Sequence, residues 1–256
     1  RWHFGQGLVE STDNFGVLGT RPTHPELLEH LSVEFARDWS LKNLHRRIML
    51  SATYQASSRA LPGLVKADPE NRLLARMPMR RLEAEEIRDA MLAVSGTMNI
   101  TRGGPALSTK NREFIFNHTS KDGTSYSSRR RSVYLPVVRN HLYEAFRLFD
   151  YNDASVPNGS RDTSTVASQA LYLLNSEFVV QTSKRLAGRL EQMHPNDNER
   201  RIRALYEISL GRLADDNEIA RANVFLDQAQ RKSDRAQAWQ LLCQTVIISN
   251  EFFYIR

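Results

Sequence analysis

The spacing of apolar residues after residue 164 most constrains what this chain can fold into. Hydrophobic side chains recur there three or four residues apart, for example at Leu186, Leu190 and Met193. This spacing places them on one face of a helix. Similar stripes begin near residues 166, 202, 219 and 239, and the turn-forming stretches "HPND" and "LGRLADD" separate some of them. The pattern therefore predicts five helices in the last third of the chain.

Helical spacing also marks the N-terminal part of the chain. The stretch "THPELLEHLSVEF" predicts a helix that opens with a capping box of Thr23 and Glu26 and has Pro25 in its first turn. Its buried face is expected at Leu27, Leu28, Leu31 and Phe35. Ser40 is expected to cap a second helix, and a linker rich in glycine, proline and aspartate follows over residues 57–71.

The middle of the chain departs from helical spacing. Two β-prone runs, "REFIFN" and "RSVYLPVV", flank the polar stretch 118–130. A structureless connection of that length is uncommon inside a compact domain, so we expect a small β-ribbon around residues 112–138. The sequence thus predicts a mainly α fold, as a single domain over residues 1–256. Its parts are a helical segment 1–95, a loop or ribbon insertion 96–138 and a helical segment 139–256.

Composition and motifs exclude several kinds of site. A single cysteine, Cys243, rules out an internal disulfide, a CxxC pair and a CxxCH haem attachment, and its stripe with Trp239 and Leu242 predicts burial. HExxH, GxSxG and phosphate-loop motifs do not occur, and no two histidines lie three or four residues apart. We expect no metal, haem or nucleotide cofactor in this chain, and a structural role for His45. No apolar run is long enough for a transmembrane segment.

The basic residues are strongly biased towards arginine. The net charge is +6, and only six of the 35 basic residues are lysine. Arginine suits bidentate binding of carboxylates, sulfates and phosphates, although GC-rich coding produces the same bias. The basic residues are spread along the chain, which does not indicate a nucleic-acid partner. The only dense cluster is Arg129, Arg130 and Arg131, which with Arg139 and Arg161 forms the candidate site for an anionic glycan.

One glutamate stands out in the stretch "RRLEAEEIRDAML". On a helical wheel, Ile87, Ala90, Met91 and Val94 form an apolar arc that includes Glu83. Glu85, Arg88 and Asp89 fall on the solvent face. A carboxylate on the inward stripe must be paired or hydrogen-bonded. We expect Glu83 to pair with an arginine such as Arg80, and a catalytic carboxylate is the alternative.

Eight motifs in order resemble a known family. They are "FGQGLVESTDNFG", "PTHPELLEHL", "WSLKNLHRRIMLSATYQASS", "RRLEAEEIRDAMLAVSG", "GGP", "RSVY", "STVASQALYLLN" and "SNEFFYIR". Together they identify the chain as similar to the domain of unknown function 1553 family. Positions that match the family pattern are His24, Pro25, Arg81, Glu83, Arg88, Asp89, Gly103, Gly104, Arg131, Asp150, Arg161, Gln169 and Asn175. His30, Gln55 and residues 213–215 depart from it.

The resemblance implies a cellular setting but no reaction. Members look like the C-terminal part of secreted, planctomycete-type proteins that also carry a c-type cytochrome domain. The resemblance thus implies an extracytoplasmic location, haem c in other domains of the full-length protein, and those domains as partners. We favour a structural or interaction domain over an enzyme. The alternatives are an anionic-polysaccharide binding module that uses the arginine-rich loop, and a hydrolase that uses Glu83.

Overall fold

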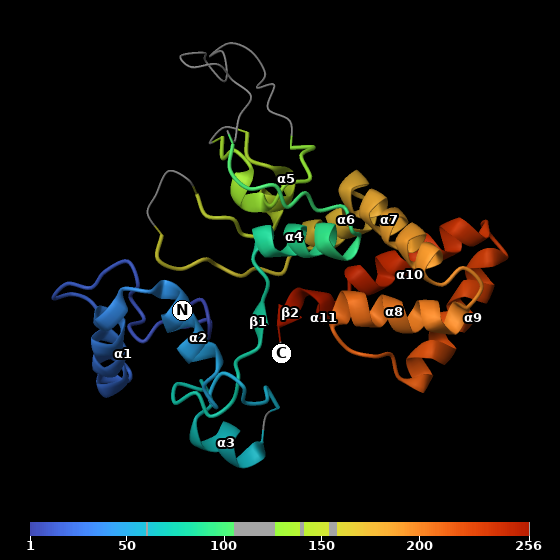
Figure 1. The fold of residues 1–256 in the computed structure, drawn as a ribbon. Coiled ribbons are helices and arrows are strands. Elements are labelled where there is room, and N and C mark those ends of the chain that lie inside the picture. Colours follow the sequence, from blue (N-terminus) through green and yellow to red (C-terminus); the bar gives the residue numbers. More distant parts are fainter. Residues whose placement is uncertain (60, 105–125, 139–140, 154–157, 256) are drawn as a thin grey trace, which may run out of the picture. The chain divides into compact units, whose positions relative to one another are not determined.

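The structure is a computed structural model that describes residues 1–59, 61–104, 126–138, 141–153 and 158–255. The chain divides into two compact units (Figure 1). Unit 1 holds residues 1–81, 156–161 and 254–256, and unit 2 holds residues 82–155 and 162–253. The fold is mainly α, as the sequence predicts.

Unit 1 contains three helices and a short strand pair. Its elements are α1 (Pro25–Asp38), α2 (Leu41–Met49), α3 (Pro62–Ala67), β1 (Arg80–Arg81) and β2 (Tyr254–Ile255). The two strands are antiparallel and pair Arg80 with Ile255. Ser40 caps α2 as predicted, because its hydroxyl accepts the N–H of Asn43 at 3.3 Å. The N-cap residue of α1 is His24 and not the predicted Thr23. No side chain makes a capping hydrogen bond there.

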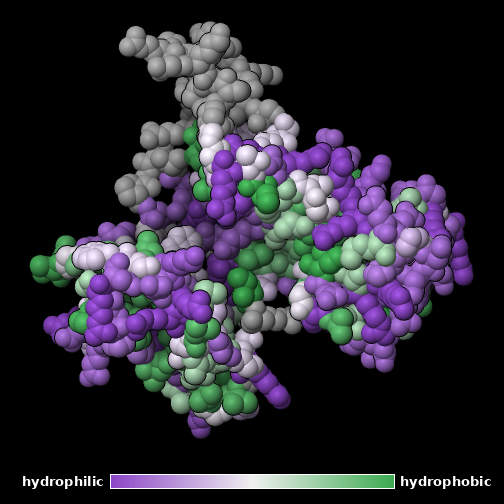
Figure 2. All heavy atoms as spheres, in the orientation of Figure 1, coloured by the Kyte–Doolittle hydropathy of each residue, from purple (hydrophilic) through white to green (hydrophobic). Residues whose placement is uncertain are grey.

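The apolar stripe of α1 is not buried. None of the residues of α1, α2 or α3 falls in the buried class. Leu27 and Leu28 are 41% and 39% exposed, so the prediction that they mark a buried face is wrong. The spacing correctly indicated a helix, but burial depends on neighbours that cover the stripe. Figure 2 shows hydrophobic residues at the visible surface around α3.

Unit 2 holds the core of the molecule. Its elements are α4 (Ala84–Val94), the 3-10 helix η1 (Ser132–Tyr134), α5 (Glu144–Leu148), α6 (Ala167–Asn175), α7 (Glu177–Met193), α8 (Asn198–Leu210), α9 (Asp216–Gln230), α10 (Arg235–Ile247) and α11 (Asn250–Phe253). Helices α6 to α10 are the five predicted from apolar spacing. Helix α7 packs against α10, and Leu186, Leu190 and Cys243 are completely buried.

Side-chain caps fix where these helices start. Ser176, Asp197, Asp215 and Asp234 each accept a backbone N–H in the first turn of α7, α8, α9 and α10, respectively. Gly211 ends α8 in the left-handed region, with φ of 70°. Burial raises the pKa of the Cys243 thiol well above its usual range, so this cysteine is an inert core residue, as predicted.

The described residues contain a small strand pair, and it lies outside the segment 112–138 for which the sequence predicts a β-ribbon. Among the described residues, the named strands are β1 and β2, at residues 80–81 and 254–255. Part of the predicted ribbon, residues 112–125, lies outside the described residues. The remainder contains η1 and a single bridge between Asn99 and Arg130. Within the described parts of the chain, no helix has the length and apolar character to cross a bilayer.

Candidate functional site

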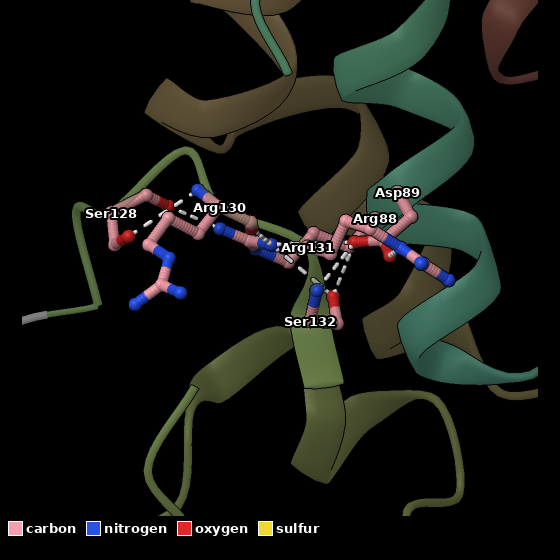
Figure 3. A network of polar contacts seen from close by, with 6 residues as sticks. All are labelled: Arg88, Asp89, Ser128, Arg130, Arg131 and Ser132. Atoms are coloured by element: carbon pink, nitrogen blue, oxygen red, sulfur yellow. Dashed lines mark hydrogen bonds and ion pairs between the residues drawn. The ribbon is translucent and has the colours of Figure 1, made fainter. Parts of the chain in front are cut away.

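The candidate site lies where α4 meets the segment 128–132, and it is built on two adjacent residues, Arg88 and Asp89 (Figure 3). Ile87, Met91 and Val94 are buried as the wheel predicts. Arg88, however, is only 2% exposed, so its assignment to the solvent face is wrong. A long arginine side chain can be buried wherever acceptors surround its guanidinium.

The Arg88 guanidinium binds the segment 128–132 through its backbone. Nη1 donates to the carbonyl of Arg130 at 2.9 Å and to the hydroxyl of Ser132 at 3.2 Å, and Nη2 donates to the carbonyl of Ser128. Burial lowers the pKa of Arg88, while Tyr143 and Asp89 oppose that shift. Arginine stays protonated in proteins even so. The buried cation is therefore compensated by carbonyl dipoles and by the neighbouring carboxylate.

The Asp89 carboxylate binds the same segment by accepting hydrogen bonds from Ser132. Its Oδ1 accepts the N–H of Ser132 at 2.8 Å and the Ser132 hydroxyl at 2.7 Å, and it lies 3.5 Å from Nη1 of Arg88. Its Oδ2 lies 4.0 Å from Nε of Arg131. The hydrogen bonds to Oδ1 fix the carboxylate against Ser132. This arrangement is a clamp between α4 and η1.

A second aspartate makes a similar clamp on another serine. Asp150 has φ of 59°, a left-handed conformation that costs energy for a residue other than glycine. Its carboxylate accepts the N–H of Ser164 at 2.8 Å and the Ser164 hydroxyl at 2.6 Å. Gln169 is buried beside it and donates to the carbonyl of Leu148 at 2.8 Å. The residues after α5 are thereby tied to the start of α6.

Buried and half-buried arginines act in the same way elsewhere in unit 2. Arg201 is 1% exposed, donates to the carbonyls of His194 and Pro195, and stacks on Trp239 at 4.6 Å. Arg189 donates to the carbonyl of Val94 at 2.7 Å. These guanidiniums bind backbone carbonyls of the protein itself. Part of the arginine bias therefore has a structural use.

The three clustered arginines do not form one surface. Arg130 turns inward, where it donates to the carbonyl of Gly103 and lies over the Tyr134 ring at 4.0 Å. Arg129 and Arg131 are exposed. Arg139 lies outside the described residues, and Arg161 belongs to unit 1. The binding role of the five arginines stays a prediction.

Glu83 stands at the start of α4 rather than on its inner stripe. It is the N-cap residue and is half-buried. The Glu86 carboxylate accepts the Glu83 backbone N–H at 2.8 Å, which is one half of a capping box. The proposed pair with Arg80 and the catalytic role both stay predictions. A carboxylate at this position is stabilised by the helix dipole, which gives Glu83 a structural use.

The sequence missed the principal residues of this clamp. Arg88 and Asp89 look like solvent-face charges on a wheel, and no local pattern joins them to Ser132, 43 residues beyond Asp89 along the chain. The only signal was the family pattern, in which Arg88, Asp89 and Asp150 are matched positions. Among the described residues, no group of three or more histidine, cysteine, aspartate and glutamate side chains is arranged to hold a metal ion.

Comparison with family models connects these residues to a known group of sequences. The model described as "PSD1: Protein of unknown function (DUF1553)" matches residues 1–226. The chain belongs to this DUF1553 family. The match runs through both units and includes the α4 clamp. No curated protein and no solved structure matches this DUF1553 chain.

Proposed function

We propose that this chain is a helical interaction and structural domain of an extracytoplasmic, cytochrome-c-linked protein. One observation carries the proposal. Unit 1 exposes large apolar side chains on and next to helices that have no buried residue, including Val33 of α1 at 53% and its C-cap Trp39 at 74%. Exposed apolar patches rimmed by polar residues are typical of interaction surfaces. The family resemblance supplies the partner, a c-type cytochrome domain of the same polypeptide.

The polar chemistry of unit 2 supports a structural role. Arg88, Asp89, Asp150 and Arg201 all bind groups of the chain itself. Such charges hold loops on helices, and their loss destabilises a fold. A domain of this kind binds its partner through a rigid surface. Electron transfer takes place in the haem-bearing part of the protein. The chain itself is expected to be colourless when purified, without a Soret band.

The test is binding of the separately produced cytochrome domain to this chain, measured by calorimetry. Val33→Asp on α1 should weaken the complex at least about tenfold, because a charge would be buried against the partner. Val224→Asp on α9 is the matched control, since Val224 is 56% exposed but lies in unit 2. Absence of a complex, or equal weakening by both variants, would contradict the proposal.

Polyanion binding is a second candidate, favoured by the exposure of Arg129 and Arg131. Arg131 is 60% exposed and Arg129 also faces solvent. Their guanidiniums suit the sulfate and carboxylate groups of a glycan. Arg129→Ser together with Arg131→Ser should lower the salt concentration that elutes the chain from heparin. The pair Arg185→Ser and Arg221→Ser removes the same charge from α7 and α9, and an equal shift with this control would rule out a local site.

A further inference from the structure

Unit 1 contains a cavity that neither the α4 clamp nor the proposed interaction role explains. Its volume is about 440 Å³, within the range of small-molecule pockets. The wall is formed by the N-terminal segment, α1, the end of α2 with the following turn, and residues 72–74. The apolar part of the wall consists of Phe4, Leu8, Leu27, Leu31, Ile48 and Leu74. Such a wall suits the apolar body of a ligand.

The ionisable side chains of the wall are all basic. Three arginines and three histidines line the cavity, and no aspartate or glutamate does. Arg1 donates to the carbonyl of Gly159, and Arg47 pairs with Glu34 at 2.5 Å. Arg72 is exposed and its guanidinium forms no ion pair with the residues that the structure describes, although its charge contributes to the lowered pKa of the nearby Asp68 carboxyl. Its guanidinium is therefore available to an anionic group.

The histidines add hydrogen-bonding groups to this wall. His3 Nε2 and His45 Nδ1 lie 2.7 Å apart, so one imidazole donates to the other. His24 Nδ1 lies 2.9 Å from the Thr23 hydroxyl. Burial, followed by the proximity of His45, lowers the pKa of His3. The His3 imidazole is therefore neutral near pH 7. It contributes a hydrogen-bonding ring to the wall and needs no counterion.

We propose that this cavity binds a small organic acid, with its apolar body against Leu27, Leu31 and Leu74 and its carboxylate on Arg72. An apolar wall and an arginine fork together select a molecule that has both parts. An alcohol with the same body would lose the charge-assisted bond. An inorganic anion would lose the apolar contacts.

The experiment compares naphthoate with naphthalenemethanol by titration calorimetry on the whole chain. Naphthoate should bind in a saturable, one-to-one manner, and the alcohol should bind about tenfold more weakly, which is the difference expected for one charge-assisted hydrogen bond. Arg72→Gln should weaken naphthoate binding by a similar factor and leave the alcohol unchanged. Arg72→Lys keeps the charge but not the fork, so its affinity for naphthoate should lie between that of the wild type and that of Arg72→Gln.

Two further variants test whether binding occurs in this cavity. One controls for nonspecific attraction to positive charge, and the other controls for nonspecific adsorption to apolar surface. Arg46→Gln removes an exposed arginine of α2 that does not line the cavity, and it should leave naphthoate binding unchanged. Thr53→Trp fills an exposed position of the wall and should abolish binding of both compounds. The proposal is overturned if naphthoate shows no saturable binding, if Arg72→Gln has no effect, or if Arg46→Gln weakens binding as much.

Discussion

Oδ1 of Asp89 accepts both the backbone N–H and the hydroxyl of Ser132, at 2.8 and 2.7 Å. These two bonds join α4 to η1 across 43 residues of chain. Arg88, the residue before Asp89, binds the carbonyls on the other side of the same segment. Two neighbouring residues of one helix thus bind both sides of the segment's polar chemistry: Asp89 accepts from the buried Ser132, and Arg88 donates to the carbonyls of Ser128 and Arg130.

Asp89→Ala should lower the free energy of unfolding by about 2–3 kcal/mol, because Ser132 loses its acceptor and the buried Arg88 loses its carboxylate. Urea denaturation followed by circular dichroism measures the change. Asp89→Asn keeps an acceptor for Ser132 and should cost less than the alanine variant. A loss below about 0.5 kcal/mol for Asp89→Ala would show that the clamp does not stabilise the fold.

Arg88→Met should loosen the segment 128–132 because methionine leaves the carbonyls of Ser128 and Arg130 without their donor. Hydrogen exchange is the direct measurement. The amides of Ser132 and of Asn99, which donates to the carbonyl of Arg129 at 2.9 Å, should exchange faster. Arg203→Met removes a partly exposed arginine from α8 and serves as the control. Unchanged exchange at both amides in Arg88→Met would argue against the clamp.

Glu83→Ala should cost about 1 kcal/mol of unfolding free energy, the usual value for loss of an N-cap or of a charge that favours the helix dipole. A buried ion pair with an arginine would instead cost about 3 kcal/mol, because it would leave an uncompensated cation. Glu83→Asp retains both capping and charge and should be close to wild type. Chemical denaturation of the two variants therefore distinguishes a cap from a buried pair.

Stability should fall in acid through Glu218. Arg212 binds Glu218 at 2.7 Å and Glu251 at 2.8 Å, and its hydrogen bond lowers the pKa of Glu218 to about 2. An unfolded glutamate titrates near ~4.3, so this stabilisation is complete above that pH and is lost as the pH falls towards 2. Because Arg212 is 39% exposed, solvent screening limits the effect to about 1–2 kcal/mol.

Unfolding measured between pH 6 and pH 2 tests this acid dependence. Glu218→Gln keeps an acceptor for the N–H of Asp215, so its helix cap is retained while the titrating group is removed. Glu218→Gln should have a lower free energy of unfolding than wild type at pH 6. Its free energy of unfolding should then fall less between pH 6 and pH 2. Glu207→Gln changes an exposed glutamate of α8 and should follow the wild-type curve. Parallel curves for wild type and Glu218→Gln would exclude Glu218 as the source.

Local sequence determined the five helices α6 to α10 of unit 2. Apolar spacing identified α6 to α10, and turn formers marked the breaks after α7 and α8. The Ser40 cap was also readable, because a cap depends on residues within about one helical turn. The predicted burial of Cys243 was correct because α7 covers the stripe of α10 on which it lies. These features follow from the periodicity of a helix, which a sequence displays directly.

Tertiary structure alone decided which charged residues are buried and which apolar faces are not. The same helical wheel that placed Glu83 inside placed Arg88 outside, whereas Arg88 is buried and Glu83 caps the helix. A helical wheel describes one helix by itself. The burial of Arg88 depends on backbone carbonyls of residues 128–130, which belong to another part of the chain. The leucines of α1 remain exposed for the converse reason, since an apolar stripe is buried only where another part of the structure covers it.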